Sequence, residues 1–300
     1  MRRSPSVLLD SARRRVVIGD GGMGTQLQIA GLEPGAAGEL WNVENPDAVV
    51  AIQRRYVNAG SAIILSNTFG GSSLALERHG LAARASELNR AGAQAACRAA
   101  GDRAWVLGDI GPFGGFLAPL GEHDPDAVFA SFLEQASALL EGGADGILVE
   151  TMSDLDELVL ALHAARQAGA ALVGGSLCFD PTAVGPRTMM GIAPAAAAAA
   201  MLAAGADILG TNCGTLKLEG YAEVVRAYRE AAPGAVIMVQ PNAGQPVLED
   251  GAAVYRQTPE AFAAALPVLA AAGANIVGGC CGTTPDHIRA LAAASAPVPL

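Results

Sequence analysis

The sequence predicts an α/β protein that folds as one (β/α)8 TIM barrel, a single domain over residues 1–300. Eight short apolar segments alternate with eight Ala- and Leu-rich amphipathic segments along the chain. An Ala-Gly pair directly precedes several apolar segments, as at Ala59 and Gly60 or Ala272 and Gly273, where a helix ends and the chain turns into a strand. Such a barrel needs about 250 residues, so this repeat leaves no room for a second domain.

Each predicted strand is followed by a predicted helix. Strands are expected at residues 16–20, 62–67, 105–109, 146–150, 171–177, 207–211, 236–240 and 275–280. Helices are expected at residues 46–59, 84–100, 125–141, 154–168, 194–204, 219–231, 259–272 and 285–294. Four of them begin with a proline after a residue that can cap the helix, namely Asn45, Asp124, Thr258 and Thr284. A doubly wound sheet is the alternative, but the Gly-rich segment 19–24 lacks G-x-G-x-x-G spacing and an acidic ribose partner.

Composition and charge narrow the function classes. The chain has 19 Lys and Arg residues against 29 Asp and Glu residues, a formal net charge of −10, and 51% hydrophobic residues. The negative charge argues against a nucleic-acid partner, and the hydrophobic content argues against general disorder. Apolar stretches stop well short of the roughly 20 residues that span a bilayer, and no apolar signal core follows the N-terminal arginines. We therefore expect a soluble, cytoplasmic protein with no nucleic-acid or membrane partner.

Three of the five cysteines are predicted to meet at one rim of the barrel. Active sites of such barrels lie at the C-terminal ends of the strands, where Cys213 follows the sixth strand and Cys280 and Cys281 end the eighth. Adjacent cysteines suit a metal site better than a disulfide framework, and the neighbouring glycines let the backbone turn so that both thiols share one ion. Three Cys ligands with an open fourth position are a catalytic zinc arrangement.

A three-thiolate zinc site predicts alkyl transfer to sulfur. Three thiolates outweigh the charge of the dication, so such a zinc ion is a poor activator of water. A zinc-bound thiol is deprotonated outright, whereas a free thiol with a pKa of about 8.5 is only slightly ionised at neutral pH. The expected reaction is alkyl transfer to a thiol substrate, with no catalytic residue beyond the zinc site.

Polar residues at the other strand ends predict a small zwitterionic thiol as the substrate. Asp20 and Glu150, at the ends of the first and fourth strands, can both reach a cationic amine in the barrel mouth. Asp109, at the end of the third strand, is expected to have a structural hydrogen-bonding role in the turn that follows. The substrate carboxylate is expected at the backbone N–H groups of two rim segments, which contain Gly21, Gly22, Thr68 and Phe69.

Seven motifs make the chain resemble the homocysteine S-methyltransferase family. They are GDGGMGTQ from Gly19, SNTFGG from Ser66, GDIGP from Gly108, VET from Val149, GTNCGT from Gly210, QPNAG from Gln240 and GGCCGTTP from Gly278. The family includes the homocysteine-binding module of cobalamin-dependent methionine synthase, betaine–homocysteine methyltransferase and S-methylmethionine–homocysteine methyltransferase. The resemblance implies that methionine forms by methyl transfer to a zinc-bound homocysteine thiolate. It also implies that zinc is held by Cys213, Cys280 and Cys281 and the homocysteine amine by Asp20 and Glu150.

The motifs define the methyl donor less closely. The QPNAG block is similar to that of methionine synthase, in which the Asn, here Asn242, can occupy the zinc position that homocysteine vacates. Trp41 stands where betaine enzymes have an aromatic residue that covers a quaternary ammonium, but Gly70 replaces the second aromatic residue. The expected order of donors is methylcobalamin, free or on a partner corrinoid protein, then S-methylmethionine, then betaine.

Two other functions compete with this interpretation. The alternative function is a non-catalytic zinc-barrel subunit that regulates a corrinoid methyltransferase system, and failure of every donor to yield methionine would favour it. An aldolase or lyase would need a Schiff-base lysine, and Lys217, the only Lys in the chain, lies beyond the sixth strand. The methyltransferase interpretation is the one that the residues favour.

Overall fold

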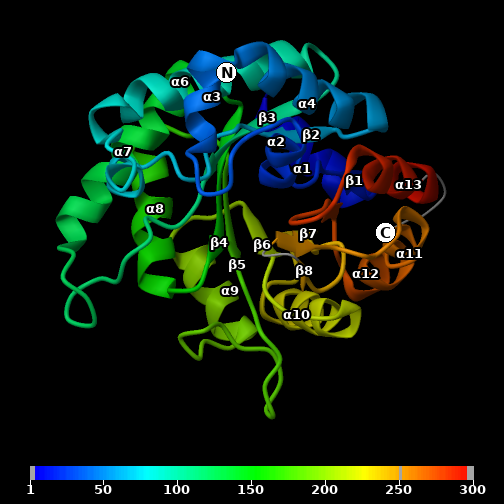
Figure 1. Cartoon of the computed structure of the whole chain (residues 1–300). Coiled ribbons are helices and arrows are strands. Elements are labelled where there is room, and N and C mark those ends of the chain that lie inside the picture. Colours follow the sequence, from blue (N-terminus) through cyan, green and yellow to red (C-terminus); the bar gives the residue numbers. More distant parts are fainter. Residues whose placement is uncertain (1–3, 250–251, 296–300) are drawn as a thin grey trace.

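The computed structural model describes residues 4–249 and 252–295, and it has the predicted (β/α)8 architecture (Figure 1). Eight parallel strands form one sheet in the order β1-β10-β7-β6-β5-β4-β3-β2. A hydrogen bond from the Ala62 N–H group to the Ile18 carbonyl (2.8 Å) joins the two ends of this sheet. The strands are β1 (Val17–Ile18), β2 (Ile63–Leu65), β3 (Trp105–Ile110), β4 (Gly146–Met152), β5 (Val173–Leu177), β6 (Ile208–Asn212), β7 (Val236–Gln240) and β10 (Ile276–Val277).

The eight strands coincide with the eight predicted apolar segments, and four of them, β1, β2, β5 and β10, are shorter than predicted. Strands β3, β5, β6 and β7 are buried along their whole length, which explains why their residues read as continuous apolar runs. Strand β4 is longer than predicted, and its register with β5 is irregular between Val149 and Met152. An antiparallel pair after β7, formed by β8 (Val247–Glu249) and β9 (Ala252–Val254), was not expected from the sequence.

Helices surround the sheet (Figure 1). Those that match predicted segments are α4 (Pro46–Ala59), α6 (Ala85–Ala100), α7 (Pro125–Glu141), α8 (Leu155–Gln167), α9 (Pro194–Ala203), α10 (Leu218–Ala231), α11 (Pro259–Ala263), α12 (Leu266–Ala272) and α13 (Pro285–Ser295). One helix was predicted over 259–272, but Pro267 has no N–H group with which to continue the helix, so α11 and α12 are separate. The elements between predicted segments are α2 (Met23–Ile29), η1 (Gly38–Leu40), α3 (Trp41–Glu44), α5 (Ser73–Glu77) and η2 (Ala82–Arg84).

The predicted helix caps are only partly present. The side chains of Asp124 and Thr258 accept hydrogen bonds from N–H groups in the first turns of α7 and α11. The expectation for Asn45 was wrong, because its side chain makes no capping bond to α4. Thr284, before α13, instead pairs with the Nδ1 atom of His287 (2.9 Å).

The N-terminal end of the barrel is filled by a helix that the sequence did not reveal, α1 (Pro5–Arg14). Leu8 and Ala12 of this helix are fully buried, and the Ala12 carbonyl accepts a hydrogen bond from the Asn275 side chain (3.0 Å). Their apolar cluster takes residues from all eight strands or the positions beside them: Val17, Ile63, Leu65, Trp105, Leu107, Leu148, Leu172, Ile208, Val236, Met238 and Ile276. The barrel therefore has an apolar floor, and polar side chains lie above it.

At this N-terminal end of the barrel, polar side chains form the same type of hydrogen bond at three different strands. Three of them stand just before a strand, and each accepts a hydrogen bond of 2.9 Å from a backbone N–H group of the preceding strand. The pairs are Asp145 with Val106, Asp207 with Val173, and Asn275 with Ile237. Because each acceptor is satisfied by the backbone, these side chains fix neighbouring strands rather than present a binding site.

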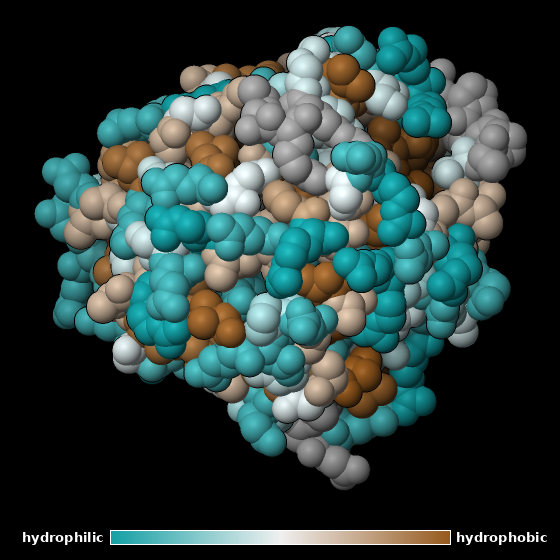
Figure 2. Space-filling model, turned by 90° about the horizontal axis from the view of Figure 1, so that it is seen from above, coloured by the Kyte–Doolittle hydropathy of each residue, from teal (hydrophilic) through white to brown (hydrophobic). Residues whose placement is uncertain are grey.

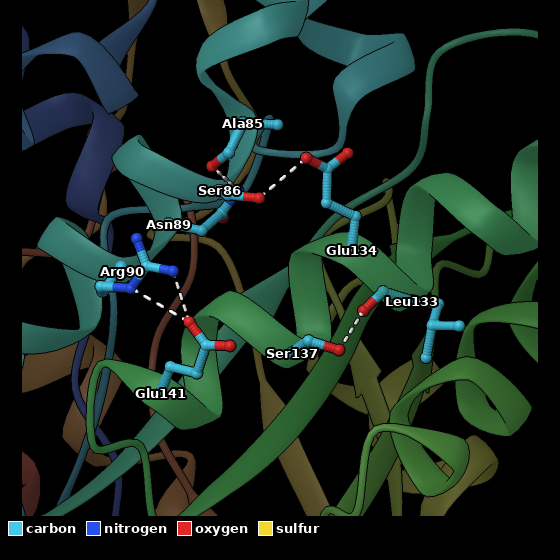
Figure 3. A network of polar contacts seen from close by, with 8 residues as sticks. All are labelled: Ala85, Ser86, Asn89, Arg90, Leu133, Glu134, Ser137 and Glu141. Carbon is cyan, nitrogen blue, oxygen red and sulfur yellow. Dashed lines mark hydrogen bonds and ion pairs between the residues drawn. The ribbon is translucent and has the colours of Figure 1, made fainter.

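The outer helices are joined by polar contacts at the surface. Between α6 and α7, the Ser86 hydroxyl donates to the Glu134 carboxylate (2.8 Å), and Arg90 forms an ion pair with Glu141 (Figure 3). Exposed pairs of this kind contribute about 1 kcal/mol or less, so the apolar faces of these helices supply most of the packing energy.

Figure 2 shows one face of the molecule, coloured by hydropathy. Hydrophilic residues cover most of the face in Figure 2, and apolar residues occur there singly or in small groups. Within residues 4–249 and 252–295, no helix combines the length and the hydropathy needed to cross a bilayer.

Candidate active site

A cavity of about 360 Å³ lies at the C-terminal ends of the strands. It is lined by residues that follow β1, β2, β3, β4, β6, β7 and β10, together with residues 36–39 and the side chains of Arg78 and His79. Nine of the ten residues predicted for the site line it: Asp20, Gly21, Gly22, Thr68, Phe69, Glu150, Cys213, Cys280 and Cys281. The tenth, Asn242, does not belong to this lining.

The three predicted metal ligands converge. The Sγ atoms of Cys213, Cys280 and Cys281 all lie within 4.8 Å of one another, and no other three His, Cys, Asp or Glu side chains do so among the described residues. Sγ of Cys281 is 3.9 Å from that of Cys213 and 4.0 Å from that of Cys280. A tetrahedral ion with Zn–S bonds of about 2.3 Å requires sulfur atoms about 3.8 Å apart. The arrangement of thiols therefore fits zinc.

The segment after β7 holds both cysteine segments in place. Cys213 donates its N–H group to the Gln240 carbonyl (3.3 Å), and Cys280 donates its own to the Pro241 carbonyl (2.8 Å). The Asn242 side chain completes the connection, because its Oδ1 accepts from the Cys281 N–H group (3.1 Å) and its Nδ2 donates to a carbonyl beside Cys213 (3.0 Å). The expectation that Asn242 ligates zinc in the substrate-free state stays a prediction, and here its amide orients the ligand backbones.

Unusual backbone conformations position the thiols. Cys213 has a φ of +54°, in the left-handed region that few residues other than glycine adopt. Gly282 has a φ of +76°, and a Cβ atom there would lie 2.1 Å from the ring of Tyr255, so only glycine fits. These positions explain how adjacent cysteines at a strand end can direct both sulfurs at one point.

A fourth cysteine, Cys178, lies beside the cluster and was missed by the sequence reasoning. It follows β5 directly, and its Sγ donates to the carbonyl of Asn212 (3.1 Å). Hydrogen bonds from Cys178, Cys280 and Cys281 lower the pKa of Cys213, whereas donation to Cys213 raises the pKa of Cys280. The signal for Cys178 was its place at the end of the fifth predicted strand, a rim position like the others.

Asn212 connects the thiols to the acidic side of the cavity. Its fully buried side chain accepts from the Ser176 hydroxyl (2.6 Å) and from the Thr151 N–H group (3.0 Å). It also donates to the Thr151 hydroxyl (2.7 Å) and to the Sγ atom of Cys280 (3.7 Å). Thr151 has a φ of +61°, a strained conformation for a β-branched residue, and the two bonds to Asn212 hold it there.

The two carboxylates predicted to bind an amine are buried in the cavity wall. Asp20 accepts the N–H group of Leu65 (2.8 Å), and burial raises its pKa to about 7. Burial, helped by the negative charges of Asp20 and Cys213, raises the pKa of Glu150 to about 8. Each carboxylate is costly to ionise without a partner, so a bound cation is stabilised by both.

Asp109 does not have the structural role that the sequence suggested. Its Oδ1 atom is buried and has no hydrogen-bond partner among the described residues. The following turn is held by its backbone instead, since its N–H group donates to the Ser66 hydroxyl (3.0 Å) and its carbonyl accepts from the Thr68 hydroxyl (2.7 Å). The side chain lines the cavity, and burial together with nearby carboxylates raises its pKa well above the usual range.

Only some of the expected backbone donors are available for a substrate carboxylate. The Thr68 N–H group donates to the Ser66 carbonyl (3.0 Å), and that of Gly22 donates to the Thr283 hydroxyl (3.0 Å). The N–H groups of Gly21 and Phe69 make no hydrogen bond to the described residues. Both residues line the cavity, after the adjacent strands β1 and β2.

The residues considered for a quaternary ammonium cage do not form one. Trp41 is half-buried, packs against the outer hydrophobic core and does not line the cavity. Gly70, in place of the second aromatic residue, donates its N–H group to the Glu39 carboxylate (2.6 Å). Lys217 lies outside the cavity, exposed before α10.

Comparisons with known proteins agree with this geometry. The chain is 38% identical to methionine synthase of Mycobacterium leprae (strain TN) and 37% identical to that of Mycobacterium tuberculosis (strain ATCC 25618 / H37Rv), in both cases over 96% of this chain. It spans only 25% of the length of these two relatives. The fold is similar to that of the metallated form of the homocysteine methyltransferase MmuM from Escherichia coli, with a TM-score of 0.79, 23% identity, and coverage of 96% of this chain and 98% of that one.

The match to a protein family covers almost the whole barrel. The homocysteine S-methyltransferase family matches residues 17–295, from β1 to the end of α13. That range contains the three clustered thiols, both buried carboxylates and every strand of the barrel. The chain therefore belongs to the homocysteine S-methyltransferase family.

Proposed function

We propose that this protein is a zinc-dependent homocysteine S-methyltransferase that forms methionine. The observation that carries the proposal is one cavity in which three thiols, spaced for zinc, face two buried carboxylates. Homocysteine has a thiol at one end and an ammonium at the other, so it complements both groups at once. The relatives named methionine synthase and homocysteine methyltransferase support this assignment.

The metal would be held by Cys213, Cys280 and Cys281. Zinc, when bound by these three thiolates, supplies a positive centre that keeps the sulfur of homocysteine deprotonated and nucleophilic. The soft sulfur donor set favours zinc over magnesium or calcium, which prefer oxygen ligands. The side-chain amide of Asn212 donates a hydrogen bond to the Sγ atom of Cys280. This bond offsets part of the negative charge that the three thiolates bring together.

Other residues orient the amino-acid end of homocysteine. Asp20 and Glu150 accept hydrogen bonds from its ammonium, and that cation favours the ionised form of both carboxylates. The N–H groups of Gly21 and Phe69 bind its carboxylate. With both ends held, the sulfur is directed at the cluster of thiols and the methyl donor approaches from the open mouth.

The cellular setting follows from the same chemistry. Thiols that bind zinc must stay reduced, and the described cysteines form no disulfide, so we place the protein in the cytoplasm. Its partners are homocysteine and a methyl donor, and a corrinoid protein is the macromolecular partner in the case of a methylcobalamin donor.

The test is methionine formation by the zinc-loaded protein. Homocysteine is supplied with methylcobalamin, S-methylmethionine or betaine, and methionine is measured by mass spectrometry. We expect methionine with at least one donor and one zinc ion per chain. Failure with all three and with a methylated corrinoid protein would favour the non-catalytic regulatory subunit.

A further inference from the structure

Asp109 belongs to the layer of side chains directly above the apolar floor of the barrel. Leu107 of β3 and Leu148 of β4 both belong to the interior cluster. Because side chains alternate along a strand, Asp109 and Glu150, two positions further on, point into the barrel as well. Asp109 is only 6% exposed, and its Oδ1 atom lacks a partner among the described residues.

No three carboxylates of the cavity lie close enough together to bind one ammonium at the same time. Asp20, Glu39, Asp109 and Glu150 all line it, yet among the described residues only the cysteines form a group of three with ligand atoms within 4.8 Å of one another. An ammonium that donates three hydrogen bonds of about 2.9 Å places its acceptors about 4.7 Å apart. One ammonium therefore engages at most two of these carboxylates.

The pair nearest the sulfurs is the one suited to homocysteine. Gly279, next to Cys280, donates its N–H group to the Asp20 carbonyl (2.8 Å), and Asn212 bonds both Thr151, next to Glu150, and the Sγ atom of Cys280. Homocysteine separates its sulfur from its ammonium by only three carbon atoms, so its ammonium stays on the side of the thiols. Asp109 is left facing the remainder of the cavity, and among the described residues it forms no ion pair, not even with Arg78 of the same lining.

An aromatic ring lies beside the turn that follows Asp109, in the lining of the same cavity. The Phe69 carbonyl accepts the N–H group of Gly111 (2.9 Å), and its ring is so close that a Cβ atom at Gly111 would lie 2.6 Å from it. The ring therefore packs against the turn that follows Asp109, and it is 41% exposed at the cavity mouth. An aromatic face next to a carboxylate attracts cations, including onium groups that donate no hydrogen bond.

We propose, on the basis of the function proposed above, that Asp109 and Phe69 bind the cationic centre of a small sulfonium or ammonium methyl donor. In the transfer, the bond between the methyl carbon and the donor heteroatom breaks as a bond from the homocysteine sulfur to that carbon forms. The electron pair of the broken bond stays on the donor, which leaves as a neutral sulfide or amine. Loss of the positive charge weakens its attraction to Asp109 and favours release.

This inference reverses the order of donors expected from the sequence. A corrinoid carries its methyl group on cobalt and offers no small onium group to a buried carboxylate. A buried carboxyl group without a partner is ionised most readily beside a cation, so Asp109 favours S-methylmethionine or a related onium over methylcobalamin. Betaine is disfavoured within this class, because Trp41 lies outside the cavity and one ring makes an incomplete cage.

The experiment measures binding without turnover. Zinc-loaded protein without homocysteine is titrated by calorimetry with S-methylmethionine and with 2-amino-5-methylhexanoate, a neutral analogue in which carbon replaces the sulfonium. Both carry the same ammonium and carboxylate, so the ratio of their affinities isolates recognition of the onium. We expect the wild type to prefer S-methylmethionine by about tenfold or more and Asp109→Asn to remove this preference.

Control variants separate recognition from folding. Asp145→Asn makes the same chemical change at the opposite end of the barrel and should keep the wild-type ratio. Asp109→Glu retains the charge and should restore part of the preference. If Asp109→Asn does not fold, as judged by zinc content and circular dichroism, Phe69→Leu should still lower the ratio several-fold.

The outcomes distinguish this inference from the function on which it rests. Equal affinity for both ligands in the wild type, or an unchanged ratio in Asp109→Asn, overturns the onium site, even if methylcobalamin yields methionine. A tenfold preference with no methionine from any donor supports the onium site and overturns the methyltransferase function.

Discussion

The two ends of the barrel treat polar side chains in opposite ways. At the N-terminal end, Asp145, Asp207 and Asn275 are each bonded to the backbone of a neighbouring strand, above the apolar contacts of α1. At the C-terminal end, buried acceptors remain without partners among the described residues, namely Oδ1 of Asp109 and Oε1 of Gln240. The comparison indicates that one end stabilises the fold and the other holds acceptors that a ligand can satisfy.

The most severe change to the site is loss of a thiol. Cys280→Ala should abolish stoichiometric zinc binding and lower turnover by at least about 1000-fold, because the two remaining thiols are too few to hold the ion. Zinc content by mass spectrometry and methionine formation are measured together. Full activity in a variant shown to contain no zinc would contradict the mechanism.

The second change removes one carboxylate of the predicted ammonium site. Glu150→Gln should raise the KM for homocysteine by about 10- to 100-fold, because it loses a charged acceptor. In the wild type, affinity for homocysteine should rise as the pH increases through about 7 and about 8, where Asp20 and Glu150 become ionised. Retention of the wild-type pH profile in Glu150→Gln would exclude Glu150 from amine binding.

The same substitution predicts a gain in stability. An acid whose pKa rises on folding stabilises the native state at low pH, and this stability is lost as the pH increases from its ordinary value toward the raised one. For Glu150 that window runs from 4.5 to about 8. Ligand-free Glu150→Gln should therefore melt at a higher temperature than the wild type at about pH 8, and a calorimetric scan measures this. Equal melting temperatures across the window would show that Glu150 is not strained by burial.

A comparable effect, on zinc affinity instead of homocysteine affinity, is expected at Asn212, which touches both halves of the site. Asn212→Ala removes the N–H group at Cys280 and the two bonds that hold Thr151, and such changes typically cost 10- to 100-fold in metal affinity. Competition with a chelator measures zinc affinity, and the charge-transfer absorption of the cobalt-substituted protein reports the thiolates directly. Ser176→Ala, which removes one bond to Asn212 and none to sulfur, serves as the milder control.

The smallest effect on the site is expected from the opposite end of the barrel. Leu8→Ala should lower the free energy of unfolding by about 2–5 kcal/mol, the range for large cavities in a packed core. Zinc affinity and kcat should remain within about twofold of the wild type, as measured below the melting temperature. A large drop in kcat would show that the two ends are coupled.

The sequence predicted the barrel because its strands are buried on both sides and so form continuous apolar runs. It did not predict α1, because only Leu8 and Ala12 of that helix are fully buried, too few to give a clear periodic pattern. The division between α11 and α12 depends on Pro267 within a run of alanines that otherwise favours a helix. The first miss concerns a helix whose partner Asn275 lies far away in the chain, and the second depends on a single residue.

The cysteine and carboxylate positions could be predicted because barrel topology alone brings strand ends together. The roles of Asn212 and Asp109 could not, since they depend on which side chains satisfy which backbone groups. The hydroxyl groups of Ser66 and Thr68 form hydrogen bonds with the backbone of Asp109. The turn therefore does not depend on the Asp109 carboxylate. A single strand-end acid gives no indication of this in the sequence.

The long separation between α1 and its partners has a consequence for protein synthesis. During synthesis, Asn275, which binds the Ala12 carbonyl, follows Ala12 by 263 positions. Cys281, whose Sγ atom lies 3.9 Å from that of Cys213, likewise follows Cys213 by 68 positions. While the chain is being synthesised, α1 therefore lacks its partner Asn275, and Cys213 lacks its partner Cys281, until β10 and the residues directly after it have been made. The residues that complete the metal site and those that fix α1 at the opposite end of the barrel are therefore translated together, between Asn275 and Cys281.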